Sequence, residues 1–314
     1  MLHELEAALH FQKQYEDHVA AASDFITEYL DDRRLDSSKF KPEFGLTLGS
    51  GLDDLTSQIE IRAEIPYNKI PSFPVPTTGG HAGIMVFGRI RGVPIIGLRG
   101  RTHYYEVANE PFNTGILKVV FAVNVLANLG VENYFTTNAV GGLNPTYCVG
   151  DVMVLNSHIN LIPNPLLGLV RNFRKVDGDQ IDRFLPMNGA YDREFRELLT
   201  TSSLGDLAHI HHGRLLAVTG PTYETEAECV AFRDGLFVDA VGMSAVPEVI
   251  AARSRGIRCV GFSCITNKVT KEGVNATNHG EVVGVLQSQE VRDRLSGIVS
   301  RFFELYSQSK NRKN

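Results

Sequence analysis

The 314-residue sequence has little cysteine and no long apolar run. Its four cysteines form no CxxC pair and are too few for a disulfide framework, so we expect reduced core thiols in a cytoplasmic protein. No signal-like apolar segment opens the sequence, and no stretch approaches the length of a membrane span, so we expect no membrane partner. The net charge is −5, so the sequence lacks the excess of basic residues that is typical of nucleic-acid-binding proteins, and we expect no nucleic acid partner.

Three motifs of common enzyme and metal sites are incomplete. The stretch "LGSGLDD" (48–54) begins like a dinucleotide-binding loop, but Asp54 replaces the third glycine of G-x-G-x-x-G, and an acid there would repel a pyrophosphate. Ser244 in "VGMSAVPE" is followed two residues later by Val246, not by the glycine of a nucleophile elbow. The histidines of "HIHHG" (209–213) have no acid or thiol at ligand spacing, so we expect no metal site.

Segments typical of strands alternate with segments typical of helices along most of the chain. An amphipathic helix to about Leu35 comes first, and a turn at Arg91-Gly92 joins two apolar stretches, 84–90 and 93–100. Such alternation favours a mostly parallel sheet wrapped by helices, and no composition shift indicates a second domain. We therefore predict an α/β fold with three parts: an N-terminal helical extension and linker (1–40), one main domain (41–309) and a tail (310–314).

Polar and small residues recur where the predicted strands end. Ligands of such sheets bind beyond the carboxyl ends of the strands, so these segments predict one shared pocket. The segments are "GSG" (49–51), "GRTHYYE" (100–106), "TNAVGG" (137–142), "GPTYE" (220–224), "GMS" (242–244) and "TN" (266–267). Arg101 and His103 then face a common anion site, because a guanidinium and an imidazole both donate to phosphate oxygens.

Other candidates have simpler alternatives when each is taken alone. "GSG" with Ser50 can cradle an anion but is more often a tight turn, and His81 in "TTGGHAG" is as readily an ordinary loop histidine. Glu224 can read the edge of a heterocycle together with Asn267, or it is simply an acid in the first turn of a helix. Cys259 and Cys264 lie on one apolar strand and are predicted to be core residues.

The series of motifs resembles the trimeric purine nucleoside phosphorylases of the nucleoside phosphorylase family, from about Phe44 to about Ser307. The resemblance is carried, in order, by "GSGL", "GHAG", "GRTHYYE", "TNAVGGLNP", "VGD", "HINL", "GPTYET", "DAVGMS", "VPEVIAAR" and "FSCITNKV". It implies a single-domain, three-layer α/β fold with a mixed central sheet. It also implies a homotrimeric pentosyltransferase of purine salvage that uses inorganic phosphate as co-substrate and no cofactor.

The family's functional residues carry over position by position. The resemblance implies that phosphate is bound by Ser50, His81, Arg101, His103, Asn138, Ala139 and Ser244, with Glu106 in support. It implies ribose contacts from Tyr105, Met243 and His279, and base contacts from Tyr223, Glu224, Val241, Gly242, Thr266 and Asn267. Asn267, Glu224 and His103 are the predicted catalytic residues. The expected substrates are 6-oxopurine nucleosides, inosine and guanosine.

The sequence departs from the family pattern at positions near the nucleoside. Tyr223 stands where many members have Phe, Thr219 and Val140 stand at positions often taken by Ala, and Leu215 replaces a frequent Tyr. Gln180 or Ile181, in "GDQIDRF" (178–184), replaces an aromatic that a neighbouring subunit usually lends to the ribose. These changes leave the phosphate residues intact and bear on nucleoside selectivity.

Two other functions fit parts of the pattern. The related enzyme that cleaves 5′-methylthioadenosine has aspartates in its base site and a small apolar residue at the position of His279, so Asn267 and His279 argue against it. A catalytically silent homologue that senses nucleoside or phosphate is the second alternative. The intact set of Ser50, Arg101, His103, Glu224 and Asn267 argues against that.

Overall fold

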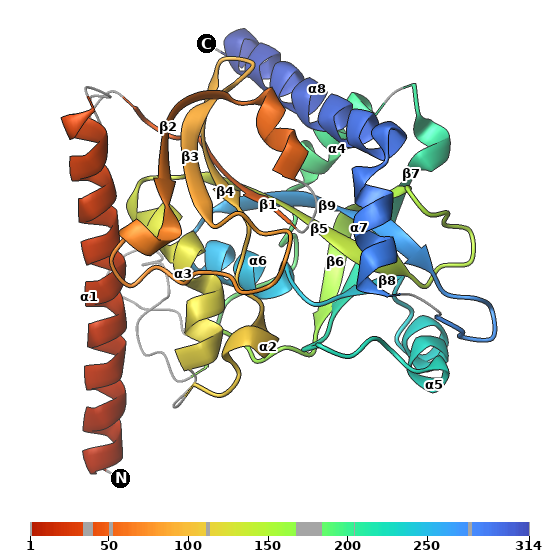
Figure 1. Cartoon of the computed structure of the whole chain (residues 1–314), viewed down its shortest axis with the longest axis horizontal. Helices are drawn as coiled ribbons and strands as arrows, with labels where there is room; N and C mark the ends of the chain where they lie inside the picture. Colours follow the sequence, from red (N-terminus) through yellow and green to blue (C-terminus); the bar gives the residue numbers. More distant parts are fainter. Residues whose placement is uncertain are drawn as a thin grey trace.

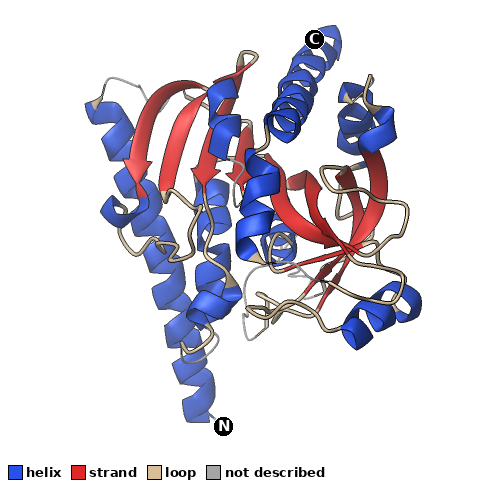
Figure 2. Cartoon of the chain, turned by 45° about the vertical axis from the view of Figure 1, so that its right-hand side comes forward, coloured by secondary structure: helices blue, strands red, loops and turns tan. Residues whose placement is uncertain are grey.

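The computed structural model describes residues 2–33, 40–49, 53–110, 114–167, 184–203, 205–275 and 278–313. These residues form a central nine-stranded sheet with helices packed on its two sides (Figures 1 and 2). The strands are β1 (Phe44–Leu48), β2 (Glu60–Pro66), β3 (Ile84–Ile90), β4 (Val93–Arg99), β5 (Asn133–Gly142), β6 (Val152–Asn160), β7 (Ile210–Ala217), β8 (Ala240–Gly242) and β9 (Arg258–Lys268). No helix in these ranges combines the length and apolar composition that a membrane crossing requires.

The helices surround this sheet. They are α1 (Leu2–Asp32), α2 (Tyr104–Val107), α3 (Thr114–Asn128), α4 (Arg193–Ser202), α5 (Glu226–Val230), α6 (Val246–Ser254), α7 (His279–Gln287) and α8 (Gln289–Lys313). Figure 1 shows α1, in red, along one edge of the molecule. Helix α8, in blue, crosses the top.

The sheet is mixed. Strands β2, β3 and β4 are antiparallel neighbours, and the predicted turn at Arg91-Gly92 joins β3 to β4. Strand β1 pairs in parallel with both β4 and β5. The alternation of elements correctly predicted an α/β fold, but it overstated the parallel character. The antiparallel pairs β5–β8 and β6–β9 join strands far apart in the sequence, and periodicity does not give their relative direction. The mixed sheet implied by the family resemblance is confirmed.

Strands β5, β8, β7, β6 and β9 close into a ring. The pairs β5–β8 and β6–β9 are antiparallel, whereas β7–β8, β6–β7 and β5–β9 are parallel. Because β9 pairs with both β6 and β5, the ends of β5, β8 and β9 are brought to the same mouth. This closure is what concentrates the polar strand ends in one place.

The sheet is covered by apolar clusters on both faces. In β5, the neighbours Tyr134 and Phe135 belong to different clusters, as expected where successive side chains point to opposite faces. Phe135 packs with Phe302 and Phe303 of α8, at ring distances of 5.0 and 6.1 Å, and Phe44 joins the same group. The two clusters make this a three-layer arrangement of helices, sheet and helices.

The long helix α1 docks on α3. Its side chains are described from residue 13 on, and Val19, Ala22 and Ile26 are fully buried at helical spacing. Tyr15 accepts a hydrogen bond from the Asn124 amide at 2.8 Å and donates to the Leu117 carbonyl. Residues 15–26 of the extension therefore have a specific attachment to the main domain.

Several expectations about individual segments needed revision. Strand β2 and helix α4 were not predicted, although the sequence carries a signal for each. Ile61, Ala63 and Ile65 alternate with charged residues in β2, and the buried Phe195 and Leu199 share one face of α4. The expectation of four core thiols is wrong for Cys148, which is exposed in the loop between β5 and β6, whereas Cys229, Cys259 and Cys264 are buried. The domain boundaries stay predictions, and α8 continues past position 309.

Candidate active site

A pocket of about 400 Å³ lies at the mouth formed by the strand ends. It is lined by Thr78, Gly79, Arg101, His103, Tyr105, Asn138, Ala139, Val140, Gly141, Pro221, Tyr223, Glu224, Val241, Gly242, Met243, Ser244, Thr266, Asn267, His279 and Val282. Five of the six polar segments that follow predicted strands contribute to this lining. The volume is in the range of a small-molecule site.

A β-bulge at the end of β9 turns two consecutive side chains into the pocket. In the pairing of β5 with β9, Val140 is opposite Ile265 and Gly141 is opposite Asn267, so Thr266 is the extra residue. Successive side chains on a regular strand face opposite sides, whereas a bulge re-aims one of them. Thr266 and Asn267 therefore both line the pocket.

Gly141 allows the Asn267 amide to lie close to β5. A Cβ atom at position 141 would lie 3.0 Å from Asn267 Nδ2, which is tighter than ordinary contact. The Asn267 Nδ2 donates to Asn275 Oδ1 at 2.9 Å, and the Thr266 hydroxyl donates to Asn267 Oδ1 at 3.2 Å. One N–H and one acceptor direction of this amide remain for a ligand.

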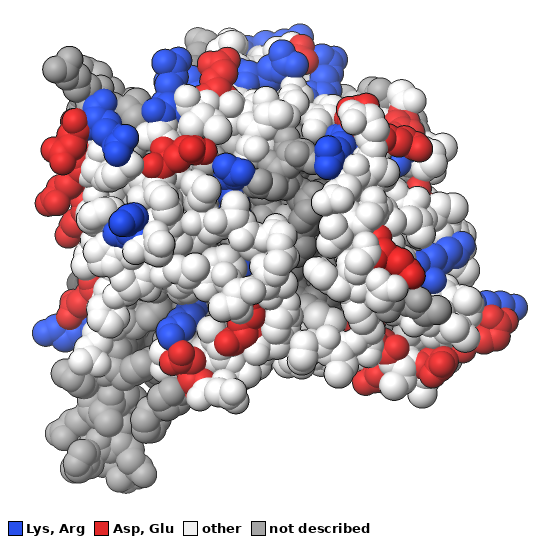
Figure 3. Space-filling model, in the orientation of Figure 1, with Lys and Arg blue, Asp and Glu red and all other residues white. Residues whose placement is uncertain are grey.

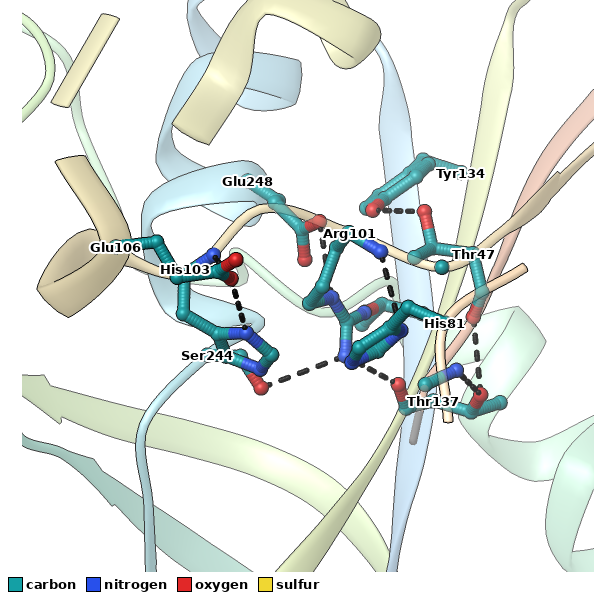
Figure 4. Close-up of polar contacts among 12 residues, drawn as sticks. Thr47, His81, Arg101, His103, Glu106, Tyr134, Thr137, Ser244 and Glu248 are labelled. Atoms are coloured by element: carbon teal, nitrogen blue, oxygen red, sulfur yellow. Dashed lines mark hydrogen bonds and ion pairs between the residues drawn. The ribbon is translucent and has the colours of Figure 1, made fainter. Parts of the chain in front are cut away.

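Arg101 is buried at the inner end of the pocket, and Figure 4 shows the side chains that surround it. Its Nε donates to Glu248 at 3.1 Å, and Nη2 donates to the Thr136 hydroxyl at 3.1 Å. Its Nη1 donates to the Thr137 carbonyl at 2.8 Å and to the Ser244 hydroxyl at a longer 3.4 Å. The guanidinium is thus held rigidly, and within the described ranges one Nη2 N–H has no protein partner.

Glu248 is the counter-ion of Arg101, and sequence reasoning missed it. Both side chains are only 4% exposed. Glu248 lies in the first turn of α6, among apolar residues that are buried on all sides. A lone acid in such an apolar helix is a signal in the sequence, since a carboxylate is rarely buried without a partner. Its other oxygen, Oε2, is buried and has no hydrogen-bond partner among the described residues.

His103 is oriented by Glu106. The Glu106 carboxylate accepts from both the backbone N–H and the Nδ1 of His103, at 2.7 and 2.9 Å, and also from Thr77 and Thr78. Burial alone would raise the pKa of Glu106, but these hydrogen bonds from His103 and Thr77 outweigh it and hold the pKa well below the usual range. Because Nδ1 is engaged, the ring edge carrying Nε2 is the one available to a ligand.

His81 does not line the pocket but packs behind it. Its ring lies 5.1 Å from that of His103, and its Nδ1 accepts from the backbone N–H of Arg101 at 3.3 Å. Burial, with the nearby His103 and Arg101, lowers the pKa of His81 to about 3. His81 is therefore neutral near pH 7, and any contribution it makes to an anion is as a neutral hydrogen-bond donor.

The outer part of the pocket carries the other predicted residues. Tyr105 stacks on His103 with the ring planes 10° apart. His279 is the first residue of α7 and is exposed at the mouth, and Met243 follows β8. Burial and the neighbouring Glu228 raise the pKa of Glu224, so this carboxyl keeps its proton to a higher pH than an exposed glutamate would.

Asn138 is almost fully buried in the pocket wall. The Ser263 hydroxyl donates to its Oδ1 at 2.7 Å, whereas its Nδ2 is buried without a partner in the described structure. Leaving a buried donor unpaired is costly, so an acceptor on a bound ligand is its natural partner. Ala139 and Ser244 line the wall beside it.

Some predicted positions fall elsewhere. Ser50 and residues 178–183, which include Gln180 and Ile181, lie outside the described residues. Val140 lines the pocket, whereas Leu215 is buried in the core and Thr219 is exposed away from the lining. His209 and His211 both hydrogen-bond to Asp151, at 2.8 and 2.7 Å, a partner that spacing along the chain did not reveal. Within the described ranges no group of three metal-binding side chains is present.

Among the described residues that line the pocket, Arg101 is the only lysine or arginine and Glu224 the only acid. On the face drawn in Figure 3, most of the coloured basic and acidic side chains lie toward the edges. Anion recognition would therefore depend on the buried Arg101 and not on a charged rim.

Comparison with known proteins agrees with this geometry. Residues 43–304 match the model of the family described as the phosphorylase superfamily. Purine nucleoside phosphorylase 1 of Bacillus subtilis is 39% identical over 272 residues, which cover 86% of this chain and 93% of that protein. Purine nucleoside phosphorylase of Bos taurus is 41% identical over 257 residues, covering 79% of this chain and 84% of that protein.

Solved structures lead to the same family. A crystal structure of schistosoma purine nucleoside phosphorylase in complex with hypoxanthine superposes with a TM-score of 0.77 at 29% identity, covering 92% of this chain and 96% of that one. A structure of the Schistosoma mansoni enzyme in complex with adenosine gives a TM-score of 0.74 at 30% identity, with the same coverage. This chain therefore belongs to the phosphorylase superfamily, in the family of the purine nucleoside phosphorylases.

Proposed function

We propose that the protein is a purine nucleoside phosphorylase that converts 6-oxopurine nucleosides and phosphate, reversibly, to the free base and (deoxy)ribose 1-phosphate. The observation that carries this proposal is that one pocket combines a buried cation beside an imidazole with an amide and a carboxyl. Arg101 and His103 form the first group, and Asn267 and Glu224 the second. The first group suits an inorganic anion and the second suits the edge of a purine.

The phosphate is the nucleophile in this mechanism. We assign its binding to Arg101, His103 and Ser244, with the Asn138 amide and the backbone at Ala139. The long contact between Arg101 and Ser244, at 3.4 Å, can open to admit an oxygen of the anion. Ser50 and His81 belong to the same assignment through the family resemblance. A rigidly held guanidinium places the anion accurately, and accurate placement of a nucleophile is a large part of catalysis.

The sugar passes through an oxocarbenium-like state. As the base leaves, the phosphate dianion under C1′ stabilises the positive charge and then captures the sugar with inversion. We assign the ribose contacts to Tyr105, Met243 and His279, with His279 orienting the 5′-hydroxyl. Phosphate itself forms the new bond, so the enzyme needs no covalent intermediate.

The leaving base develops negative charge, and we assign the stabilisation of this charge to Asn267. The amide N–H that remains after the bond to Asn275 donates to the O6/N7 edge of the purine, and ionised Glu224 accepts from N1–H. A donor held ready for developing charge contributes about 3–4 kcal/mol to the transition state. Tyr223, Val241, Gly242 and Thr266 complete the walls of the base site.

Further properties are proposed from family membership. We expect a homotrimer in the cytoplasm that serves purine salvage and requires phosphate but no cofactor. Light scattering under assay conditions tests the trimer, and a particle at the monomer mass of 34.6 kDa would refute it.

The test of the activity is inosine cleavage with and without phosphate. Hypoxanthine should appear only when phosphate is present, and ribose 1-phosphate should appear with it. Rapid release of hypoxanthine in phosphate-free buffer would indicate a hydrolase and overturn the proposal.

A variant tests the base assignment. Asn267→Asp should narrow the preference for inosine over adenosine, because a carboxylate accepts from a 6-amino group and repels O6. Asn311→Asp, on the exposed end of α8, makes the same chemical change away from the pocket and serves as the control. An unchanged ratio of kcat/KM values in Asn267→Asp would remove Asn267 from this role.

A further inference from the structure

Asn275 contacts the proposed base-binding amide from outside the pocket. It does not line the cavity, but its Oδ1 accepts the hydrogen bond from Asn267 Nδ2 at 2.9 Å. An asparagine side chain can present its N–H₂ or its C=O to a ligand, depending on which way the amide is turned. The residue that sets this orientation therefore also sets whether Asn267 can bind a 6-oxopurine or a 6-aminopurine.

The other neighbour of Asn267 does not decide the orientation. The Thr266 hydroxyl lies 3.2 Å from Asn267 Oδ1 and 3.3 Å from the Val140 carbonyl, and it has one proton to donate. When it donates to Asn267, it favours the orientation described above. When it donates to Val140, its oxygen is free to accept from the turned amide. Thr266 is therefore compatible with both orientations.

Asn275 is held in place by a compact turn. The backbone N–H of Thr270 donates to the Val274 carbonyl at 2.9 Å, and the Val274 N–H donates to the Thr270 hydroxyl at 3.1 Å. Gly273 has φ +95°, and a Cβ atom there would lie 2.4 Å from the Glu226 carbonyl oxygen, so only glycine fits. The turn joins β9 to the segment before α7, and it places Asn275 within hydrogen-bond distance of Asn267.

We propose that Asn275 is the positioning residue that turns the Asn267 amide for 6-oxopurines, and that it thereby sets base selectivity. This inference rests on the proposed function. With Asn275 as acceptor, Asn267 keeps its second N–H for the O6/N7 edge. Without that acceptor the amide can turn and offer its carbonyl, which suits a 6-amino group.

Aspartate and alanine at position 275 separate orientation from simple packing. The Asn275 Nδ2 is buried without a partner in the described structure, so Asn275→Asp removes no hydrogen bond. A carboxylate only accepts, and it holds Asn267 in the 6-oxo orientation. Asn275→Ala removes the acceptor. Val274→Ala changes an exposed side chain in the same turn and is the matched control.

The experiment measures kcat/KM for inosine and adenosine at saturating phosphate. Asn275→Ala should lower the inosine-to-adenosine ratio at least about tenfold, since sites that read a base by hydrogen bonds discriminate strongly. Asn275→Asp and Val274→Ala should keep or raise the ratio, even if both rates fall. A loss of folded protein would lower both rates equally and leave the ratio unchanged. A ratio in Asn275→Ala within about twofold of wild type would overturn the inference.

Binding of the free bases distinguishes this inference from the proposed function. Calorimetry with hypoxanthine and adenine needs no turnover, and the ratio of dissociation constants should shift in Asn275→Ala in the same direction. If the wild type binds hypoxanthine and the ratio does not move, the role of Asn275 is refuted while the proposed function stands. If the wild type binds neither base and cleaves neither nucleoside, both are refuted.

Discussion

The ion pair between Arg101 and Glu248 yields a prediction about stability and phosphate together. Glu248→Gln keeps an oxygen that accepts from Arg101 Nε, but it removes the negative charge beside the guanidinium. Both side chains are 4% exposed, so water does not replace the lost charge. In phosphate-free protein, Arg101 is then a buried charge without a counter-ion.

Two independent estimates give the loss of folding stability in Glu248→Gln. Opposite charges about 4 Å apart attract by about 4 kcal/mol at an effective dielectric constant near 20. Removing one partner of a buried pair typically costs about 3–5 kcal/mol. Because glutamine retains the hydrogen bond, we expect the lower end, about 3 kcal/mol. For a domain somewhat smaller than this one, each kcal/mol shifts Tm by about 2–4 °C, so Tm should fall by roughly 6–12 °C.

Phosphate should restore much of this loss. A dianion at the proposed site becomes the missing counter-ion, so it binds the variant more tightly than the wild type and stabilises it by mass action. Calorimetric unfolding with and without phosphate measures this, and Glu290→Gln, at an exposed position on α8, is the control. The phosphate-induced rise in Tm should be larger in Glu248→Gln than in the wild type. A Tm unchanged without phosphate, or a smaller rise with it, would refute the reasoning.

Three further changes test other parts of the site. Arg101→Ala should raise the phosphate KM and lower kcat, because the guanidinium both binds and aims the nucleophile; initial-rate kinetics with the same phosphate KM would contradict that. The inosine-to-adenosine ratio of kcat/KM should rise with pH, because the raised pKa of Glu224 leaves a protonated carboxyl at lower pH that can donate to N1 of adenine. A ratio that stays flat between pH 5 and 8 would show that Glu224 does not contact the base. Gly141→Ala should lower inosine kcat/KM at least about tenfold with little change in Tm, because its Cβ would displace the Asn267 amide 3.0 Å away; unchanged kinetics would show that the amide tolerates the shift.

The convergence of the polar strand ends was predictable from the sequence. Apolar stretches that end in "GRTHYYE", "TNAVGG" and "TN" indicate strands, and strands that run the same way in one sheet deliver their carboxyl ends to one edge. This is a property of local pattern and of chain direction, so it needs no knowledge of side-chain contacts. The order and spacing of the motifs likewise carried the family and the fold.

The orientation of the side chains at that edge was decided by tertiary structure. Glu248 meets Arg101 across 147 positions, and no local period links them. The β-bulge that turns both Thr266 and Asn267 inward comes from the register between β5 and β9, which sequence alone does not fix. Cys148 has the same composition-based expectation as the buried cysteines but lies in an exposed loop.

This division has a physical reason: local structure depends on residues that are close in the sequence, whereas side-chain contacts depend on residues that meet only in the folded chain. Residue type and order determine which segments form strands and which chemical groups follow them, because these depend on neighbours a few positions away. Burial, counter-ions and the direction of an amide depend on residues that meet only when the ring of β5, β8, β7, β6 and β9 closes. The sequence by itself thus indicated most of the residues that line the pocket, and the closed sheet decided how Arg101, Asn267 and Asn275 are held within and behind it.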